Sequence, residues 1–267
     1  MIDPGLEGKV AVVTGANHSV GAATAQALAA QGALVFITYF RPTRPASEDV
    51  LSNARAAGVG GPHLLWAGQR QTAEGLLREI NEHGGKATAL EADLGKPENI
   101  PAVFDACESA LGPVDILVNN HTHDAKDTFD PAAVTTEGFA TEPFCAEIAD
   151  AHFAVNARAY ALMMAEYLRR YLARGARWGR IVNVSTDGAH AHPASVSYAA
   201  TKHAIESYSR SAALEMGKYG ITVNIVALGP IQSGWITPEQ EKAIAAGTPL
   251  GRCGRPEDAS DVIVMFA

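Results

Sequence analysis

The chain has 267 residues, of which 47% are hydrophobic and 19% charged, and its net charge is -8. This composition is typical of a globular protein and excludes a disordered or collagen-like chain. The acidic balance does not favour a nucleic-acid partner or an anionic membrane surface. Three cysteines without paired spacing favour neither a disulfide framework nor structural zinc, so we expect a cytoplasmic location. No apolar run has the length of a transmembrane helix, and the N-terminus lacks the features of a signal peptide.

Short β-branched runs alternate with Ala-rich stretches of helical period along the chain. Several of the expected strands are apolar on both faces, as a parallel sheet between two helical layers requires. The pattern predicts a doubly wound α/β Rossmann fold, with a central parallel sheet flanked by helices on both faces and a single domain over residues 1–267. The expected strands are residues 9–14, 33–39, 87–91, 114–119, 180–185 and 222–227, and the expected helices are residues 21–31, 72–83, 100–110, 148–173 and 198–216.

Two segments interrupt this alternation. Residues 41–68 follow the second expected strand and are rich in Pro, Gly and Ala, and residues 121–141 follow the fourth. Long loops at the carboxyl ends of parallel strands usually carry binding functions. Both segments are therefore candidate walls of a ligand site.

A glycine-containing turn joins the first expected strand to the first helix. Gly15 permits a tight turn, Gly21 permits close packing of helix on strand, and the helix N-terminus offers N–H groups to a pyrophosphate. Ser19 occupies the position of the middle glycine of the usual fingerprint. The alternative is a small-residue turn of the kind found in any α/β protein. The expected phosphate-binding residues are Gly15, Asn17, His18, Ser19, Val20 and Gly21.

Polar residues follow two further strands on the edge where a nucleotide would lie. Asp93 and Leu94 end the third strand, and Asn119 ends the fourth. Taken alone, Asp93 is as well explained as a turn residue. Together with the glycine turn, these strand ends predict one cofactor crevice.

The sharpest constellation is formed by Ser185, Tyr198 and Lys202. Tyr198 and Lys202 are four residues apart in a helical stretch and share one face, while Ser185 ends the preceding strand. An adjacent ammonium group is expected to lower the pKa of a phenol, which makes Tyr198 a usable acid or base. Ser185 could hydrogen-bond the reacting oxygen. The alternative is an ordinary solvated helix pair, and only the spacing to Ser185 and to the glycine turn argues against it.

These residues together resemble the short-chain dehydrogenases/reductases, over essentially the whole chain. The resemblance is carried by Thr14-Gly15…Gly21, Asp93-Leu94, Asn119-Asn120, Asn156, Ser185 thirteen residues before Tyr198, Lys202, Gly229-Pro230…Ser233, and the closing run from Pro249 to Asp258. The C-terminal half is similar to proteins labelled 3-oxoacyl-acyl-carrier-protein reductases. The sequence departs from the family pattern at three places: Ser19, His121-Thr122 in place of Ala-Gly, and Leu228 in place of proline. Each departure narrows or reshapes the expected cofactor cleft.

The resemblance implies a role for each matching position. Tyr198 would be the general acid/base, Lys202 would lower its pKa and hold the nicotinamide ribose, and Ser185 would orient the carbonyl. Asn156 would anchor a water that relays protons to Lys202. The implied catalytic set is Asn156, Ser185, Tyr198 and Lys202, and further cofactor contacts are implied for Asn119, Gly229, Pro230, Ile231 and Ser233.

The second strand bears on which dinucleotide is bound. An acidic residue at its end would suit NAD, whereas arginine suits the additional phosphate of NADP. The sequence there has Tyr39, no acid, and then Arg41 and Arg44. NADP(H) is therefore the preferred cofactor and NAD(H) the alternative. Both arginines could equally be solvated loop charges.

Several alternatives stay open from the sequence. His121 with His123, and His190 with His192, have His-x-His spacing but no third ligand, so no metal is expected. These histidines are better interpreted as polar residues of a substrate pocket or as surface residues without a role. The substrate is expected to be a small carbonyl or alcohol. An NAD-linked sugar, steroid or alcohol dehydrogenase, a non-catalytic cofactor-binding module and a methyltransferase are the other candidates. The family resemblance suggests a homodimer or homotetramer and a last strand beyond residue 267.

Overall fold

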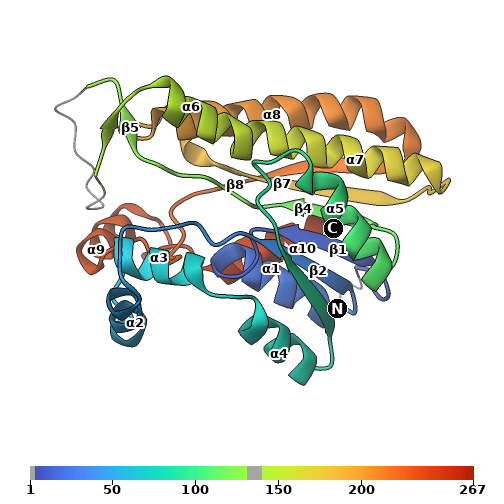
Figure 1. Cartoon of the computed structure of the whole chain (residues 1–267), viewed down its shortest axis with the longest axis horizontal. Coiled ribbons are helices and arrows are strands. Elements are labelled where there is room, and N and C mark those ends of the chain that lie inside the picture. Colours follow the sequence, from blue (N-terminus) through green and yellow to red (C-terminus); the bar gives the residue numbers. More distant parts are fainter. Residues whose placement is uncertain (1–3, 131–139) are drawn as a thin grey trace.

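Six parallel strands form the central sheet of the computed structural model, which describes residues 4–130 and 140–267 (Figure 1). The strand order is β3-β2-β1-β4-β7-β8. The two halves of this doubly wound sheet meet between β1 and β4: one half is β1-β2-β3 and the other is β4-β7-β8. The predicted Rossmann fold is confirmed. The strands are β1 (Val10–Thr14), β2 (Leu34–Tyr39), β3 (Lys86–Glu91), β4 (Ile116–Asn119), β7 (Gly179–Thr186) and β8 (Ile221–Leu228).

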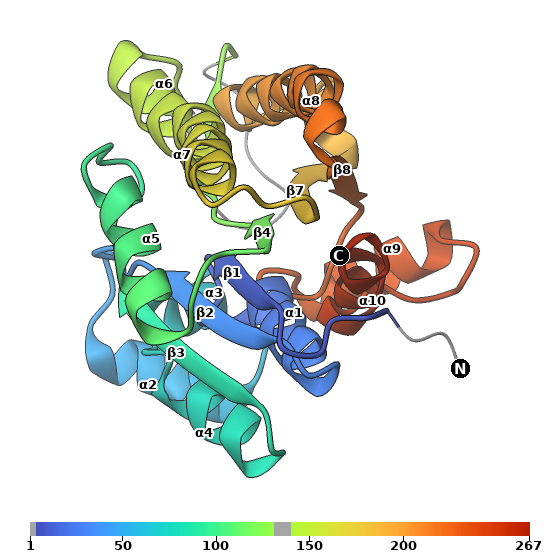
Figure 2. The same cartoon turned by 90° about the vertical axis from the view of Figure 1, so that its right-hand side faces the viewer.

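Helices cover both faces of the sheet (Figure 2). Side chains of α1 (Ser19–Ala30), α4 (Glu74–Glu82) and α10 (Pro256–Phe266) join the core on one face. Those of α5 (Asn99–Ala110), α7 (Ala159–Ala173) and α8 (Val196–Met216) join it on the other. Alternate residues of β1 and β4 therefore enter opposite cores, which explains why these strands are apolar on both faces.

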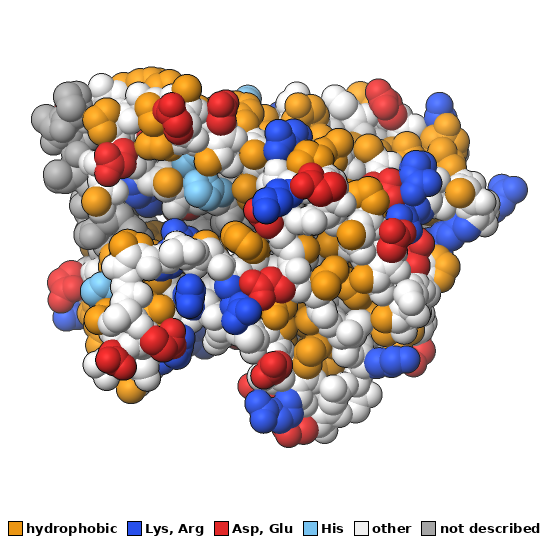
Figure 3. All heavy atoms as spheres, viewed as in Figure 1, with side chains coloured by type: hydrophobic (Ala, Val, Ile, Leu, Met, Phe, Trp, Pro, Cys, Tyr) orange, Lys and Arg blue, Asp and Glu red, His pale blue; other side chains and the backbone are white. Residues whose placement is uncertain are grey.

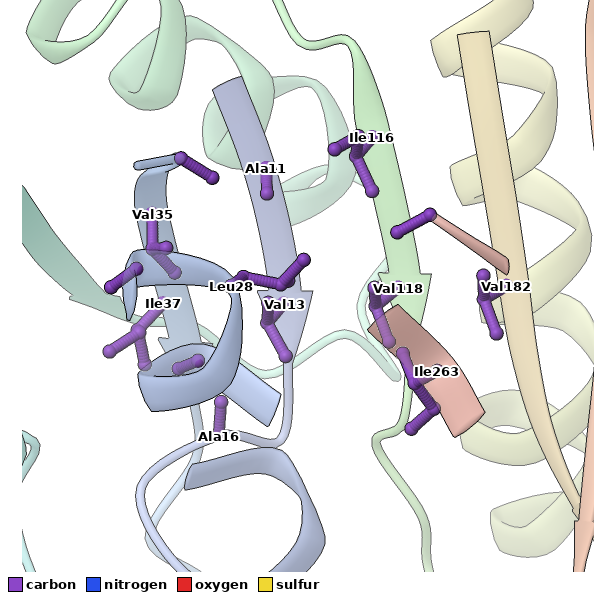
Figure 4. Close-up of a cluster of buried hydrophobic side chains, with 14 of the residues drawn as sticks. Ala11, Val13, Ala16, Leu28, Val35, Ile37, Ile116, Val118, Val182 and Ile263 are labelled. Carbon is purple, nitrogen blue, oxygen red and sulfur yellow. The ribbon is translucent and has the colours of Figure 1, made fainter. Parts of the chain in front are cut away.

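The core beneath α1 and α10 fixes the edge at which the site lies (Figure 4). Val13, Val118 and Val182 come from three neighbouring strands and pack with Ile263 of α10. All four side chains are fully buried. Burial on this scale, about 1.5–3 kcal/mol for each such side chain, holds the carboxyl ends of β1, β4 and β7 in register.

The segment of residues 41–68, expected to be a loop, contains a helix and most of another: α2 (Glu48–Ala57) and α3 (Pro62–Arg70). The Ser47 hydroxyl accepts a bond from the Val50 N–H at the start of α2, and Gly58 ends it in the left-handed conformation. Pro62 begins α3. These are ordinary cap signals, and the high Pro and Gly content obscured them.

The expected helix over residues 148–173 is interrupted. It consists of α6 (Ala146–His152), a π-helical turn (Phe153–Arg158) and α7. The remaining elements are β5 (Asp127–Thr128), β6 (Glu142–Pro143), α9 (Pro238–Gly247) and the 3-10 turns Asp187–Ala189 and Gly217–Tyr219. Residues 131–139 of the second candidate ligand wall lie outside the described residues. In the described part of the chain, no helix has the length and apolarity to cross a membrane.

Candidate active site

The glycine turn after β1 is built as the sequence predicts. Gly15 has a φ of 63°, and a Cβ there would lie 2.8 Å from the Cα of His121. A Cβ at Gly21 would overlap the carbonyl oxygen of Gly15. Ser19 also adopts a positive φ, 51°, which a side chain rarely tolerates. The turn thus keeps the backbone of the glycine fingerprint with a serine at its middle position.

The helix that follows can receive an anion. The N-cap residue of α1, His18, makes no side-chain capping bond, so the first N–H groups of the helix are not satisfied by a side chain. A cavity of about 300 Å³ opens here, bordered by His18, Ser19, Gly68 and Ser233 among others. Neither this cavity nor the larger one beside α4 is lined by Tyr198 or Lys202. Val20 is a core residue, and the Asn17 amide donates to the carbonyls of Gln69 and Gln71.

The two arginines after β2 differ in their surroundings. Arg41 donates to the Glu91 carboxylate from Nε at 2.9 Å and from Nη2 at 2.7 Å, so its guanidinium is held at the end of β3. Arg44 is half-buried, and its Nε donates to Gln69 Oε1 at 2.9 Å. Burial, and then the charge of Arg44, lower the pKa of His18 to about 4. The Gln69 carbonyl in turn accepts a bond from the Asn17 amide at 3.2 Å, so Arg44 lies near the glycine turn.

Other strand-end residues lie on the same edge. Asp93 Oδ1 accepts a bond from the Gly95 N–H at 2.9 Å and so forms its own turn, while Leu94 is buried. Thr38 and Asn119 each have a buried side-chain oxygen without a partner in the described part of the chain. Such oxygens suit the hydroxyl and amino donors of a nucleotide. Tyr39 packs partly against the core, and Pro230 and Gln232 hydrogen-bond Gly254 on either side of the Ile231–Gly254 bridge.

Tyr198 and Lys202 meet in the first turns of α8. Lys202 Nζ lies 5.7 Å from the centre of the Tyr198 ring and donates to the Val184 carbonyl at 2.9 Å. Burial lowers the pKa of Lys202 to about 8. Burial, and then the charge of Asp124, raise the pKa of Tyr198. The expected lowering of the phenol pKa by Lys202 is therefore wrong for this structure: burial and the nearby carboxylates raise this pKa, and the group that counteracts them is Thr186.

The hydroxyl beside Tyr198 is that of Thr186 and not that of Ser185. The Thr186 side chain hydrogen-bonds Tyr198 and counteracts part of the rise in its pKa. The Ser185 hydroxyl donates to Glu206 Oε1 at 3.0 Å, one turn beyond Lys202 on α8. Consecutive residues of a strand point to opposite sides, so only one of the two can face the phenol. The spacing of thirteen residues before Tyr198 therefore pointed to Ser185, the neighbour of the residue whose hydroxyl lies beside the phenol.

The predicted Asn156 lies in the π-helical turn and is fully buried. Its Oδ1 accepts a bond from the His123 N–H at 2.7 Å, and its Nδ2 donates to the His123 carbonyl at 2.9 Å and to Thr201 Oγ1 at 3.1 Å. Thr201 directly precedes Lys202. Asn156 thereby ties the segment after β4 to the helix that carries the tyrosine and the lysine. A π-helical turn at a functional residue is a recurrent arrangement.

The paired histidines do not converge. His121 is buried, with Nδ1 at 2.7 Å from Thr14 Oγ1 and Nε2 at 3.1 Å from the Val155 carbonyl. The His123 ring contacts the His152 ring, and His190 contacts His203. His192 lies against Tyr198, with ring centres 6.4 Å apart. No group of three potential metal-binding side chains occurs among residues 4–130 and 140–267.

Two further residues lie near the site where the sequence did not place them: Tyr160, expected to be a core or subunit-contact residue, and Asp124. The centre of the Tyr160 ring lies 5.5 Å from Lys202 Nζ, and the Tyr160 hydroxyl donates to the His121 carbonyl at 2.9 Å. Asp124, in the segment after β4, exerts its charge on both Tyr198 and Lys202. No short motif marks either residue, since both reach the site through tertiary packing. Figure 3 shows a recess between α6 and α3, and histidine, Lys and Arg side chains lie beside it.

The fold and this site define a nucleotide-binding oxidoreductase, and comparisons with known proteins agree. A family model described as enoyl-(acyl carrier protein) reductase matches residues 52–267. The chain belongs to the short-chain dehydrogenase/reductase family, whose members bind NAD or NADP. It is 30% identical to an uncharacterised oxidoreductase of Bacillus subtilis over 97% of this chain and 89% of the relative.

Two more similar proteins belong to the same class of enzyme. An NADPH-dependent aldehyde reductase-like protein of Arabidopsis thaliana is 32% identical over 98% of this chain and 88% of the relative. The crystal structure of a dehydrogenase/reductase from Sinorhizobium meliloti superposes with a TM-score of 0.74 and 27% identity, covering 98% of this chain and 88% of that one. The chain is thus a short-chain dehydrogenase/reductase enzyme.

Proposed function

We propose that the protein is an NADP(H)-dependent reductase that interconverts a carbonyl and a secondary alcohol. The observation that carries this proposal is the convergence of Tyr198, Lys202 and Thr186 at the carboxyl end of β7. The buried Thr38 and Asn119 oxygens and the uncapped start of α1 fit a dinucleotide, which would supply the hydride when bound. The 3-oxoacyl-acyl-carrier-protein reductase resemblance names one candidate substrate and stays a prediction, as does a homo-oligomeric state.

The chain's own residues would handle the proton. Tyr198 would deliver it to the carbonyl oxygen, and a phenol with a raised pKa stays protonated at neutral pH, as a donor must. Thr186 would take the role predicted for Ser185 and hydrogen-bond the oxygen as charge develops on it. Lys202 would bind the ribose next to Tyr198, and Asn156 would hold the backbone around it.

Tyr198→Phe tests the proposed chemistry. Turnover of a ketone panel that includes acetoacetyl thioesters should fall about 100- to 10,000-fold, because the proton donor is gone, while cofactor binding measured by fluorescence is retained. Thr186→Ala should lose about 100-fold, and Ser185→Ala, the matched control, much less. Unchanged turnover in Tyr198→Phe would overturn the mechanism. A wild-type protein that binds cofactor but reduces nothing would be a binding module.

The preference for NADP(H) rests on Arg44. Arg41 is engaged by Glu91, whereas Arg44 lies near the glycine turn, so the two arginines predicted together should contribute differently. Arg44→Ala should weaken binding of NADPH about 10-fold or more and leave NADH affinity unchanged, because a guanidinium is a strong phosphate ligand. Arg41→Ala is the matched control. Equal loss for both cofactors would favour the NAD-linked alternative.

A further inference from the structure

Asp124 has one carboxylate oxygen that the fold does not use. Its Oδ2 pairs with Lys126 Nζ at 2.8 Å. Its Oδ1 is buried and has no hydrogen-bond partner among residues 4–130 and 140–267. The side chain as a whole is 32% exposed, so the carboxylate lies at the boundary between the protein and the space in front of it.

The backbone on both sides of Asp124 is fixed next to the site: the His123 N–H donates to Asn156 Oδ1 at 2.7 Å, and the Ala125 N–H donates to His152 Nε2 at 3.3 Å. The charge of Asp124 acts on Tyr198 and Lys202, the proposed proton donor and its lysine. It also acts on Arg44 and on its neighbour His123. Asp124 therefore lies beside the reacting end of the crevice.

A buried carboxylate oxygen without a donor is unfavourable by about 1–3 kcal/mol or more, so such atoms normally have a partner. The neighbouring cations hydrogen-bond other groups: Lys202 Nζ donates to the Val184 carbonyl, and Arg44 Nε donates to Gln69 Oε1. A carboxylate can only accept, so the missing partner must be a donor. A molecule that brings a hydroxyl or ammonium group to the site would satisfy Oδ1.

We propose that Asp124 selects substrates that carry a hydroxyl or ammonium group next to the carbonyl that is reduced. This inference rests on the proposed reductase function and names its substrate class: hydroxy ketones, hydroxy aldehydes or amino ketones. The same carboxylate disfavours keto acids, because like charges repel. Asp187, whose charge also acts on Tyr198, adds to that repulsion.

A series of three-carbon carbonyls tests the inference, because its members differ only in the group beside the ketone: acetone, hydroxyacetone, aminoacetone and pyruvate. The wild type should prefer hydroxyacetone and aminoacetone to acetone by about 10- to 100-fold in kcat/KM, and pyruvate should be the poorest. Asp124→Leu should abolish this preference, so that kcat/KM for hydroxyacetone and aminoacetone falls to the value that the same variant shows for acetone. Asp124→Asn should keep part of the hydroxyl preference and lose that for ammonium. Asp187→Asn, the matched control, changes a charge near Tyr198 and should leave the hydroxyacetone-to-acetone ratio unchanged.

A second measurement separates the substrate from the cofactor as the donor. Affinity for NADPH, followed by fluorescence, should be equal in the wild type and in Asp124→Leu. Weaker cofactor binding with an unchanged substrate ratio would assign Asp124 to the cofactor and overturn the inference, as would equal kcat/KM for acetone and hydroxyacetone in the wild type.

The reductase and the role of Asp124 fail in different ways. If none of the four compounds and no thioester is turned over, the proposed function fails. Binding still decides the inference then: 1,2-propanediol should stabilise the wild type against heat more than 2-propanol does, and this difference should vanish in Asp124→Leu. Equal stabilisation of the wild type by both alcohols would overturn it.

Discussion

His121 is a buried imidazole beside the glycine turn, at a position where the family usually has a small residue. The Val155 carbonyl can only accept, so His121 Nε2 carries the proton and the ring is neutral, with Nδ1 beside the Thr14 hydroxyl. Burial, and then the charge of Lys202, lower the pKa of His121 to about 3. The native state therefore resists protonation of this ring at a pH where the unfolded chain accepts it.

Acid should destabilise the protein through His121. Because the pKa of its ring is lower in the folded than in the unfolded state, about 6.5, stability falls as the pH falls below that value. At pH 4 the loss corresponds to about 3 kcal/mol. Urea unfolding at pH 7 and pH 4 should show a smaller difference for His121→Ala than for the wild type. The exposed His83→Ala is the control, and an unchanged difference in His121→Ala would contradict the assignment.

Single residues were predictable from the sequence where a regular element fixes their geometry. Tyr198 and Lys202 follow from helical spacing, which places residues four apart on one face. The choice between Ser185 and Thr186 does not follow, because the irregular segment between β7 and α8 has no fixed length and a shift of one residue reverses the side of the strand. The pKa of Tyr198 depends on Asp124 and on burial, which only the tertiary structure reveals.

Helix α8 carries both Tyr198 and Lys202, and its first turn is capped by a residue of another element. The N-cap residue Ser195 makes no side-chain capping bond. Instead the fully buried Asp127 of β5 accepts the Ser197 N–H at 3.0 Å and also the Ser197 hydroxyl. Ser197 directly precedes Tyr198. A carboxylate at a helix N-terminus is favoured by the helix dipole as well as by these bonds.

Removing this cap should loosen the first turn of α8. Asp127→Ala should lower the free energy of unfolding by about 2 kcal/mol and reduce kcat with little change in KM, because Tyr198 loses its fixed position. Asp127→Asn keeps an acceptor and should recover part of both. Glu147→Ala, in the exposed first turn of α6, is the matched control and should leave stability almost unchanged. Chemical unfolding and steady-state kinetics measure these effects, and a normal kcat in Asp127→Ala would refute the positioning role.

The two helices that begin within residues 41–68 were not predicted from the sequence, although each has a recognisable start. Both have clear start signals, Ser47 and Pro62, but α2 buries only Leu51 and α3 only Ala67. Both helices have an apolar and a polar face, but the Pro and Gly residues around them pointed to a loop. The strongly buried strands were located well because no such residues interrupt their apolar runs.

At the scale of the whole molecule, these helices contact a segment far away in the sequence. The Gly61 N–H donates to the Gly234 carbonyl at 2.8 Å, and a Cβ at Gly60 would overlap the carbonyl oxygen of Ile236. The cavity beside the glycine turn is bordered by both partners, through Leu64 of α3 and Ser233. The sequence predicted each segment near the cofactor but gave no sign that they touch, because contact across about 170 residues depends on the finished fold.

Gly60→Ala should separate the two segments. The added methyl group cannot fit against Ile236, so we expect a loss of about 1–3 kcal/mol in stability and weaker NADPH binding at the shared cavity. Gly75→Ala is the matched control, because a Cβ in that helical position meets no atom within 4 Å. Thermal unfolding and fluorescence titration give the two readouts. Full cofactor affinity in Gly60→Ala would show that the contact is not needed for the site.

The π-helical turn at Phe153–Arg158 has an evolutionary consequence. Such a turn accommodates one more residue than an α-helical turn, and each residue of an α-helix rotates the chain by about 100°. Losing a single codon within this stretch would restore a regular helix and swing α6 around its axis relative to α7, carrying Asn156 away from His123 and Thr201. Insertions and deletions should therefore be rarer here in descendants of this gene than in the surface loops, where chain length can drift freely.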